Sequence, residues 1–196
     1  MKIVALAGSP RRRGNTGLLL EAAIKGVRDT RQEVEVFALN SLSIKPCQGC
    51  NNCLKIGACI YQDDMQGLYE AFDQAGGFII SSPVYFTSVS AQLKAVIDRC
   101  QIYHWSSRRD PGLHAVDRKK RPGIFLATSG RPEGKGGSFE HSLAVVETLG
   151  LVLGMKIVQK VLVPDTDWVP VTEGSIFLER AYQAGRYLSS WIRQEV

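Results

Sequence analysis

The 196-residue chain lacks several features that would place it in large classes of protein. It has no apolar run long enough to span a bilayer, no internal repeat and no low-complexity linker. Met1 leads straight into a strand-like segment without a secretory leader, so we expect a cytoplasmic protein with no membrane partner. Aromatic residues are only 8% of the chain and do not interleave with basic ones, so we expect no nucleic-acid partner.

Strictly spaced phosphate-binding signatures are also missing. Gly8 and Gly14 have five residues between them instead of the four of a Walker loop, and no Gly-Lys-Ser/Thr follows. The G-x-G-x-x-G fingerprint of dinucleotide-binding domains is absent as well. The three histidines, His104, His114 and His141, are scattered, and we interpret them as structural or surface residues.

The composition is that of an ordinary soluble globular protein, with 44% hydrophobic and 22% charged residues. It predicts one domain over residues 1–196, with a cysteine-rich insertion at about 40–63. The net charge is +5, and six of the basic residues lie between Arg108 and Arg121 against two acidic ones. Such a basic segment suits a solvated loop, the phosphate of a cofactor or an acidic redox partner.

Strand-like and helix-like segments alternate along the chain. The near-continuous apolar segments 2–8, 76–83 and 123–130 are typical of buried parallel strands, whereas 33–39 and 155–163 are more polar, as edge strands are. Five helical patterns separate or follow these strands. The alternation predicts an α/β protein whose five-stranded parallel sheet has the order 2-1-3-4-5 and helices on both faces. Ligands of such sheets bind beyond the carboxyl ends of the strands.

Three loops at those strand ends have unusual sequences. The first reads GSPRRRGNTG (8–17), in which Asn15 and Thr16 are candidates to cap the following helix, whose N-terminus attracts anions. The second reads SSPVYFTSVS (81–90) and offers aromatic side chains to a flat ring. The third reads TSGRPEGKGGS (128–138), where four glycines allow the backbone to approach a ligand closely.

Four segments resemble one known family: GSPRRRGNT, the cysteine run that closes on DDM, SPVYF, and SAQLKAVIDR. The chain is similar to the flavodoxin-like NAD(P)H-dependent FMN reductases, and most similar to their iron–sulfur flavoprotein branch. The resemblance implies a flavodoxin-like three-layer sandwich, FMN as cofactor and NAD(P)H as electron donor. It implies that a nicotinamide transfers hydride to the flavin, which then delivers electrons to an acceptor. Because the flavin carries this chemistry, the resemblance also implies that there is no catalytic acid–base residue.

The resemblance also implies which residues hold FMN. It assigns the phosphate to Ser9, Arg11, Asn15 and Thr16. It assigns the isoalloxazine ring to Pro83, Val84, Tyr85 and Phe86, and the other side of the ring to Thr128, Ser129 and Gly130. A homodimer or homotetramer is expected on the same ground.

The cysteine run has the spacing Cys47-x2-Cys50-x2-Cys53-x5-Cys59. Its start matches the ferredoxin pattern that binds a [4Fe–4S] cluster, although the last gap is longer than in ferredoxins and no proline follows. We therefore predict a [4Fe–4S] cluster on these four cysteines. A zinc site, which usually uses two separated cysteine pairs, and a loop without metal are the alternatives. Cys100 falls on an apolar helix face and is expected in the core.

Two functional classes follow from these predictions. In the first, FMN and the cluster exchange electrons with NAD(P)H or a ferredoxin-like carrier. In the second, a reductase uses FMN alone on quinones, flavins or other small acceptors. A third, non-enzymatic class is a redox sensor, which would show no turnover with any donor.

Overall fold

The computed structural model describes residues 2–109, 120–132, 134 and 139–194. For residues 106–109 it describes the backbone only. All five strands are parallel and follow the order β2-β1-β3-β4-β5. Their bounds are Lys2–Ala7 (β1), Val34–Ala38 (β2), Ala75–Pro83 (β3), Arg121–Thr128 (β4) and Met155–Val163 (β5). The α/β fold class and the strand order predicted from the sequence are confirmed.

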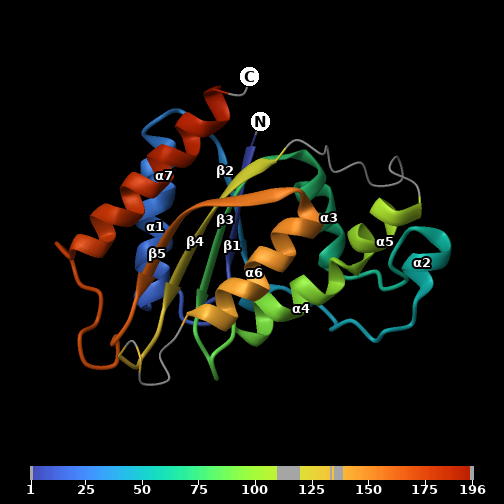
Figure 1. The fold of residues 1–196 in the computed structure, drawn as a ribbon, viewed down its shortest axis with the longest axis horizontal. Coiled ribbons are helices and arrows are strands. Elements are labelled where there is room, and N and C mark those ends of the chain that lie inside the picture. The colour runs from blue at the N-terminus through green and yellow to red at the C-terminus, as the bar shows by residue number, and fades with distance from the viewer. Residues whose placement is uncertain (1, 110–119, 133, 135–138, 195–196) are drawn as a thin grey trace.

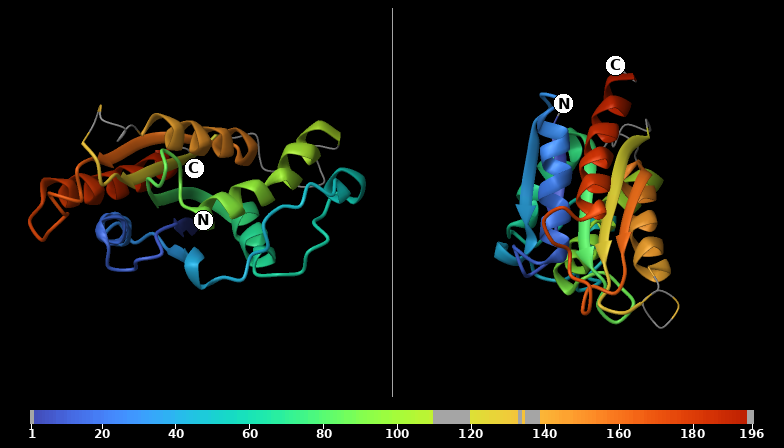
Figure 2. Two further views of the ribbon diagram at one scale, coloured as in Figure 1. Left: turned by 90° about the horizontal axis from the view of Figure 1, so that it is seen from below. Right: turned by 90° about the vertical axis from the view of Figure 1, so that its left-hand side faces the viewer.

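Helices cover both faces of the sheet (Figures 1 and 2). One face carries α1 (Asn15–Arg28) and α7 (Ile176–Gln194). The other face carries α3 (Met65–Gln74), α4 (Ala91–Arg99), α5 (Gln101–Arg109) and α6 (Glu140–Leu153). A short 3₁₀ helix, η1 (Leu39–Ser41), and the short helix α2 (Asn52–Ile56) precede α3. Within the described ranges, no helix combines the length and the apolar character needed to cross a membrane.

The central strands are buried along nearly their whole length because both of their faces are covered. In β1, Ile3 and Ala5 belong to the core under α1 and α7, whereas Val4 and Leu6 belong to the core under α3 and α4. The same alternation holds along β3 and β4. The strands β2 and β5 lie at the sheet edges, and several residues of each are exposed. The prediction that these two are edge strands is therefore confirmed.

The prediction of five helices in strict alternation is wrong, because extra helical segments occur in the sequence both before and after β3. The sequence between β2 and β3 forms η1 and α2 as well as the predicted α3. The helix predicted around Leu93 and Val96 ends at Arg99, and α5 starts directly afterwards. These pieces are short, so that tertiary packing, and not periodicity alone, holds them as helices. Cys100, at the break, is buried as expected.

Candidate functional site

The loop after β1 leads into the N-terminus of α1 without a side-chain cap. The cap position is Gly14, and no side chain accepts a hydrogen bond from the first turn. The prediction that Asn15 and Thr16 cap this helix is therefore wrong. Asn15 Oδ1 instead accepts a hydrogen bond from Val171 N at 2.9 Å, and Thr16 Oγ1 bonds Thr128 Oγ1 at 2.7 Å. The uncapped helix N-terminus remains available to an anion.

Ser9 and Arg11 shape the start of the same loop. The Ser9 hydroxyl donates to the Arg11 carbonyl at 3.1 Å and accepts from the Arg11 backbone N–H at 3.2 Å. The Arg11 side chain is exposed. Ser9 therefore fixes a tight turn, while Arg11 has a charge free to meet a phosphate at the helix end.

The loop after β3 is a two-residue hairpin. Tyr85 and Ser88 exchange backbone hydrogen bonds of 2.9 and 3.0 Å, with Phe86 and Thr87 at the tip. Both tip residues have positive φ, 47° and 65°, which is the conformation of a type I′ turn and is strained for residues other than glycine. Phe86 is 102% exposed and Tyr85 is 44% exposed. The hairpin thus presents two aromatic side chains beside the carboxyl end of the sheet.

Thr128, at the end of β4, joins the other two loops. Its hydroxyl bonds Thr16 in the first loop, and its carbonyl accepts from Val84 N at 2.8 Å. Next to it, Ser129 is buried and donates its backbone N–H to Val163 O at 2.9 Å. Figure 1 shows the loops after β1, β3 and β4 together beyond the carboxyl ends of the strands, at the lower side of the view. The glycine-rich segment predicted at 128–138 falls only partly within the described residues, which omit 133 and 135–138.

The loop after β5 lies against the loop after β4, at the same end of the sheet. The sequence analysis did not predict this loop as part of the site. Thr166 Oγ1 donates to Ser129 O at 3.1 Å, and Asp165 N donates to Arg131 O at 3.0 Å. Asp165 has a φ of 62°, and its Oδ1 is buried with no hydrogen-bond partner among the described residues. The available signal was an acidic residue two positions after a strand, at the end of the sheet where ligands bind.

The cysteine run lies apart from these loops, where α2 packs against α5 (Figure 1). Cys47, Cys50, Cys53 and Cys59 all line one cavity, and none forms a disulfide. Cys47 and Cys50 are exposed, and the other two are half-buried. In the part of the chain that the structure describes, no three cysteine, histidine or acidic side chains lie close enough to share a single metal ion. The cavity has about 30 Å³, so the exposed segment would have to open to admit a cluster.

Two thiols in this run have shifted pKa values. Burial raises the pKa of Cys53, and the neighbouring Cys47 and Cys59 sulfurs add to the rise. The pKa of Cys50 is lowered by hydrogen bonds from the backbone and side chain of Asn52. The thiols therefore already affect one another electrostatically, and one of them is more easily deprotonated than a free cysteine.

An ion pair between a buried arginine and a half-buried aspartate holds the two ends of the cysteine run together. Arg99, from the end of α4, donates Nη1 to Asp63 Oδ2 at 2.8 Å and Nη2 to Asp63 Oδ1 at 3.1 Å. The same guanidinium donates to Lys45 O at 2.7 Å and Tyr61 O at 3.4 Å, on either side of the run. The sequence pointed to both partners only as members of the DDM and SAQLKAVIDR segments, with no role assigned.

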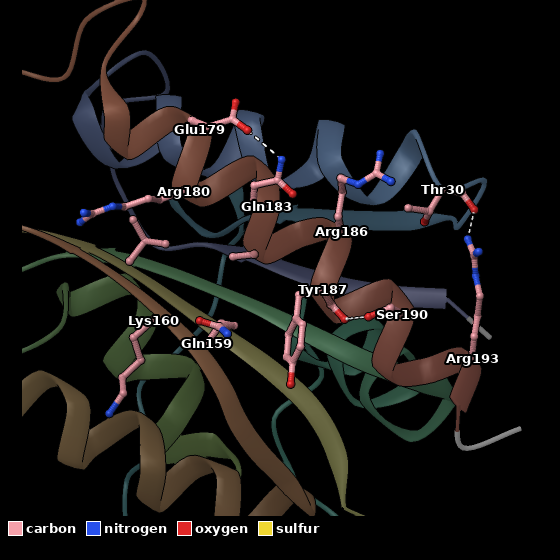
Figure 3. Close-up of a pocket in the computed structure, with 12 residues that line it drawn as sticks. Thr30, Gln159, Lys160, Glu179, Arg180, Gln183, Arg186, Tyr187, Ser190 and Arg193 are labelled. Carbon is pink, nitrogen blue, oxygen red and sulfur yellow. Dashed lines mark hydrogen bonds between the residues drawn. The ribbon is translucent and has the colours of Figure 1, made fainter.

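A second cavity, of about 690 Å³, lies between α7 and β5 (Figure 3). Its lining includes Lys160, Arg180, Arg186 and Arg193 and none of the residues predicted to bind FMN or a cluster. These basic side chains are exposed. The other basic segment singled out from the sequence, 108–121, falls almost entirely outside the described residues. The basic cavity between α7 and β5 therefore lies apart from the candidate site.

Comparisons with known proteins show the family of the chain. Residues 1–168 match the family model described as NADPH-dependent FMN reductase. An iron-sulfur flavoprotein of Archaeoglobus fulgidus is 32% identical over 175 residues, which cover 89% of this chain and 82% of that protein. A second iron-sulfur flavoprotein of that organism is 41% identical over 103 residues, 53% of this chain. That match spans only 47% of the relative, about half of its length.

Solved structures support the fold. A NAD(P)H:quinone oxidoreductase from Methanothermobacter marburgensis superposes with a TM-score of 0.67 over 96% of both chains, at 20% identity. At that identity the likeness shows a shared fold only. The family match covers most of the chain. The match to the first Archaeoglobus relative covers most of this chain and most of that protein. The chain therefore belongs to the NADPH-dependent FMN reductase family, and within it is most like the iron–sulfur flavoproteins.

Proposed function

We propose that the chain binds FMN at the carboxyl ends of its strands and acts as an NAD(P)H-dependent oxidoreductase. One observation carries the proposal: the loops after β1 and β3 both bond Thr128, beside the uncapped N-terminus of α1. A helix end with free N–H groups suits a phosphate, and the hairpin aromatics suit a flat ring. Family membership supports the same cofactor.

Each predicted residue has a role in this proposal. The α1 N-terminus, Ser9 and Arg11 bind the phosphate, while Asn15 and Thr16 hold the loop in place through their bonds to Val171 and Thr128. Residues 83–86 and 128–130 border the ring on its two sides. Bound FMN supplies the chemistry, since it accepts hydride from a nicotinamide and passes electrons on. The chain orients the cofactor and shields it from water.

The Thr16–Thr128 bond provides the test. Thr16→Val keeps the shape of the side chain but leaves the buried Thr128 hydroxyl without its partner, and a loss of about 1 kcal/mol corresponds to roughly fivefold weaker FMN binding. The measurement is a flavin fluorescence titration of the apoprotein. Thr148→Val is the matched control, because the Thr148 hydroxyl bonds only its own helix at Ala144 O. Unchanged affinity in Thr16→Val, or no FMN binding by the unaltered protein, would contradict the proposal.

We further propose that Cys47, Cys50, Cys53 and Cys59 hold a [4Fe–4S] cluster. The four sulfurs share one cavity on a largely exposed segment, and they are soft ligands free of disulfides. Each iron of the cube takes one thiolate, so the cysteine sulfurs need not converge on one ion as they do around zinc, where bonds of about 2.3 Å bring all ligands close. Relatives that carry the name iron-sulfur flavoprotein support this finer proposal.

The second candidate is a reductase that uses FMN alone. It is favoured by the small volume of the cysteine cavity, about 30 Å³, which would have to open to admit a cluster. Anaerobic purification followed by assays of iron, acid-labile sulfide and flavin separates the two. About four irons per chain supports the cluster. Flavin with no iron, even after reconstitution with iron and sulfide, supports the reductase without a cluster.

We propose NAD(P)H as electron donor and a ferredoxin-like carrier or a small molecule as electron acceptor. A homodimer or homotetramer would give the exposed Phe86 a surface to bury. Five free cysteines fit a reducing compartment, and we place the protein in the cytoplasm on that ground. Light scattering on the purified protein tests the assembly, and a monomer at all concentrations would exclude it.

A further inference from the structure

Arg99 uses nearly all of its hydrogen-bonding capacity at the base of the cysteine run. A guanidinium has five N–H donors. The four on its terminal nitrogens meet Asp63 twice and the carbonyls of Lys45 and Tyr61 once each, at 2.7–3.4 Å. The side chain is only 1% exposed. Four donors are therefore accounted for inside the protein.

The fifth donor, Nε–H, is different. Arg99 Nε is buried and has no acceptor among the described residues. The side chain lines the same cavity as all four cysteines of the run. Electrostatic interactions link it to Cys50 and Cys59. A buried donor without an acceptor is rare in native structures and indicates a missing ligand, water or ion.

We propose that Arg99 tunes the cysteine-bound cluster: its Nε–H donates to a sulfur of the cluster, and its charge stabilises the reduced state. This inference rests on the cluster proposed above. A cluster held by four thiolates is anionic and becomes more negative when it takes up an electron. Hydrogen bonds to sulfur and nearby positive charge both raise the reduction potential of such a centre. Arg99 is thus a positioning residue that also acts on the electronics of the site.

The ion pair with Asp63 makes this role separable from a merely structural one. Arg99→Gln removes the Nε–H and the positive charge, so the reduced state loses stabilisation. Asp63→Asn removes the negative charge and keeps Arg99, so the reduced state gains stabilisation. If Arg99 only braced the loop, both variants would break the same pair and would affect the cluster in the same way.

The experiment is a potentiometric titration of the full-length protein after anaerobic reconstitution. Dithionite supplies the electron, and EPR follows the reduced cluster. In Arg99→Gln the equilibrium constant for one-electron reduction should fall about tenfold, a shift of about 59 mV to lower potential. In Asp63→Asn the potential should rise. Lys94→Gln is the matched control, because Lys94 is an exposed cation on the same helix, paired with Asp98 at 2.7 Å.

Each outcome decides the matter. An unchanged potential in Arg99→Gln, or shifts of the same sign in both variants, overturns the inference. If Arg99→Gln keeps FMN but loses iron, the Asp63→Asn variant decides: a raised potential supports the inference, and a lowered or unchanged potential, or the loss of its iron as well, overturns it. If the unaltered protein takes up no iron, the proposed cluster itself fails, and the inference fails with it.

Discussion

At the scale of single residues, Asp63 shows how one side chain organises the cysteine segment. Its carboxylate accepts from Arg99 and from the backbone N–H groups of Lys45 and Met65. Burial by itself would raise the pKa of Asp63, but the hydrogen bonds from Arg99 and the two backbone groups outweigh it. The pKa is therefore lowered below that of a free aspartate.

This lowered pKa predicts how stability depends on pH. An unfolded aspartate titrates at about 3.9, so the ion pair contributes its full stability above that pH and loses it as the pH falls through the lower native pKa. Asp63→Asn should cost about 3 kcal/mol at pH 7, because it leaves Arg99 buried and unpaired, and should lack this acid-side loss. Urea unfolding at pH 7 and on the acid side measures both effects. Asp98→Asn, in the exposed pair with Lys94, should change stability by less than about 0.5 kcal/mol.

Phe86 has both a strained backbone and a fully exposed ring, a combination that stability alone does not explain. A positive φ costs an ordinary residue about 1 kcal/mol and is tolerated by asparagine. Phe86→Asn should therefore raise the unfolding free energy by up to about 1 kcal/mol and weaken FMN binding. Arg31→Asn is the matched control, since Arg31 also has a positive φ, 64°, in the turn after α1. A Phe86→Asn protein that binds FMN as well as the unaltered protein would exclude a flavin role for this ring.

At the scale of elements, α1 and α7 pack with their backbones nearly in contact. A Cβ added at Gly185 of α7 would lie 2.0 Å from Ala23 O, and one added at Gly26 of α1 would lie 2.1 Å from Tyr182 O. Two small residues in matched positions let these helices form one layer over the sheet (Figure 2). Neither glycine signals this in the sequence, since each falls inside an otherwise regular helical pattern.

The close approach predicts opposite effects for two glycine substitutions. Gly185→Ala should destabilise the protein by about 1–3 kcal/mol, because the clash with a backbone carbonyl exceeds the gain in helix propensity. Gly67→Ala, in α3, should stabilise it by about 0.5–1 kcal/mol, because Gly67 is exposed and has no neighbour within 4 Å. Urea midpoints of both variants give the comparison. A stabilised Gly185→Ala would show that the two helices can move apart at little cost.

At the scale of the whole molecule, α4 links the two proposed cofactor sites. At its N-terminus the Ser90 hydroxyl donates to Gly8 O, at the start of the first loop, at 2.6 Å. At its C-terminus Arg99 holds the cysteine run. Nine helical residues span about 13 Å. A rigid helix of that length sets the separation between the loops proposed to bind FMN and the base of the cysteine segment.

This arrangement predicts that the two sites can be lost separately. Cys50→Ser should abolish iron binding and leave FMN binding within about twofold, because hydrogen bonds from α4, and not the thiols, hold the base of the run. Cys100→Ala is the control, since it removes a cysteine buried in the core and should keep the iron. Iron and flavin contents of the same samples provide the readout. Loss of FMN together with iron in Cys50→Ser would show that the sites depend on each other.

The sequence by itself determined the sheet, its order and its edges. Continuous apolar segments mark strands covered on both faces, and short crossovers leave few topologies. It also predicted the loops at the carboxyl edge and the cysteine spacing, because glycine, proline and cysteine patterns are local.

Only the tertiary structure decided which distant groups meet. Thr16 bonds Thr128, Asn15 caps no helix but bonds Val171, and Arg99 reaches both ends of the cysteine run. These contacts join residues between 38 and 156 positions apart in the chain. No local pattern encodes them, because they arise when packing of the sheet and helices brings those polar groups within bonding distance. The buried, unpaired Nε of Arg99 became visible for the same reason.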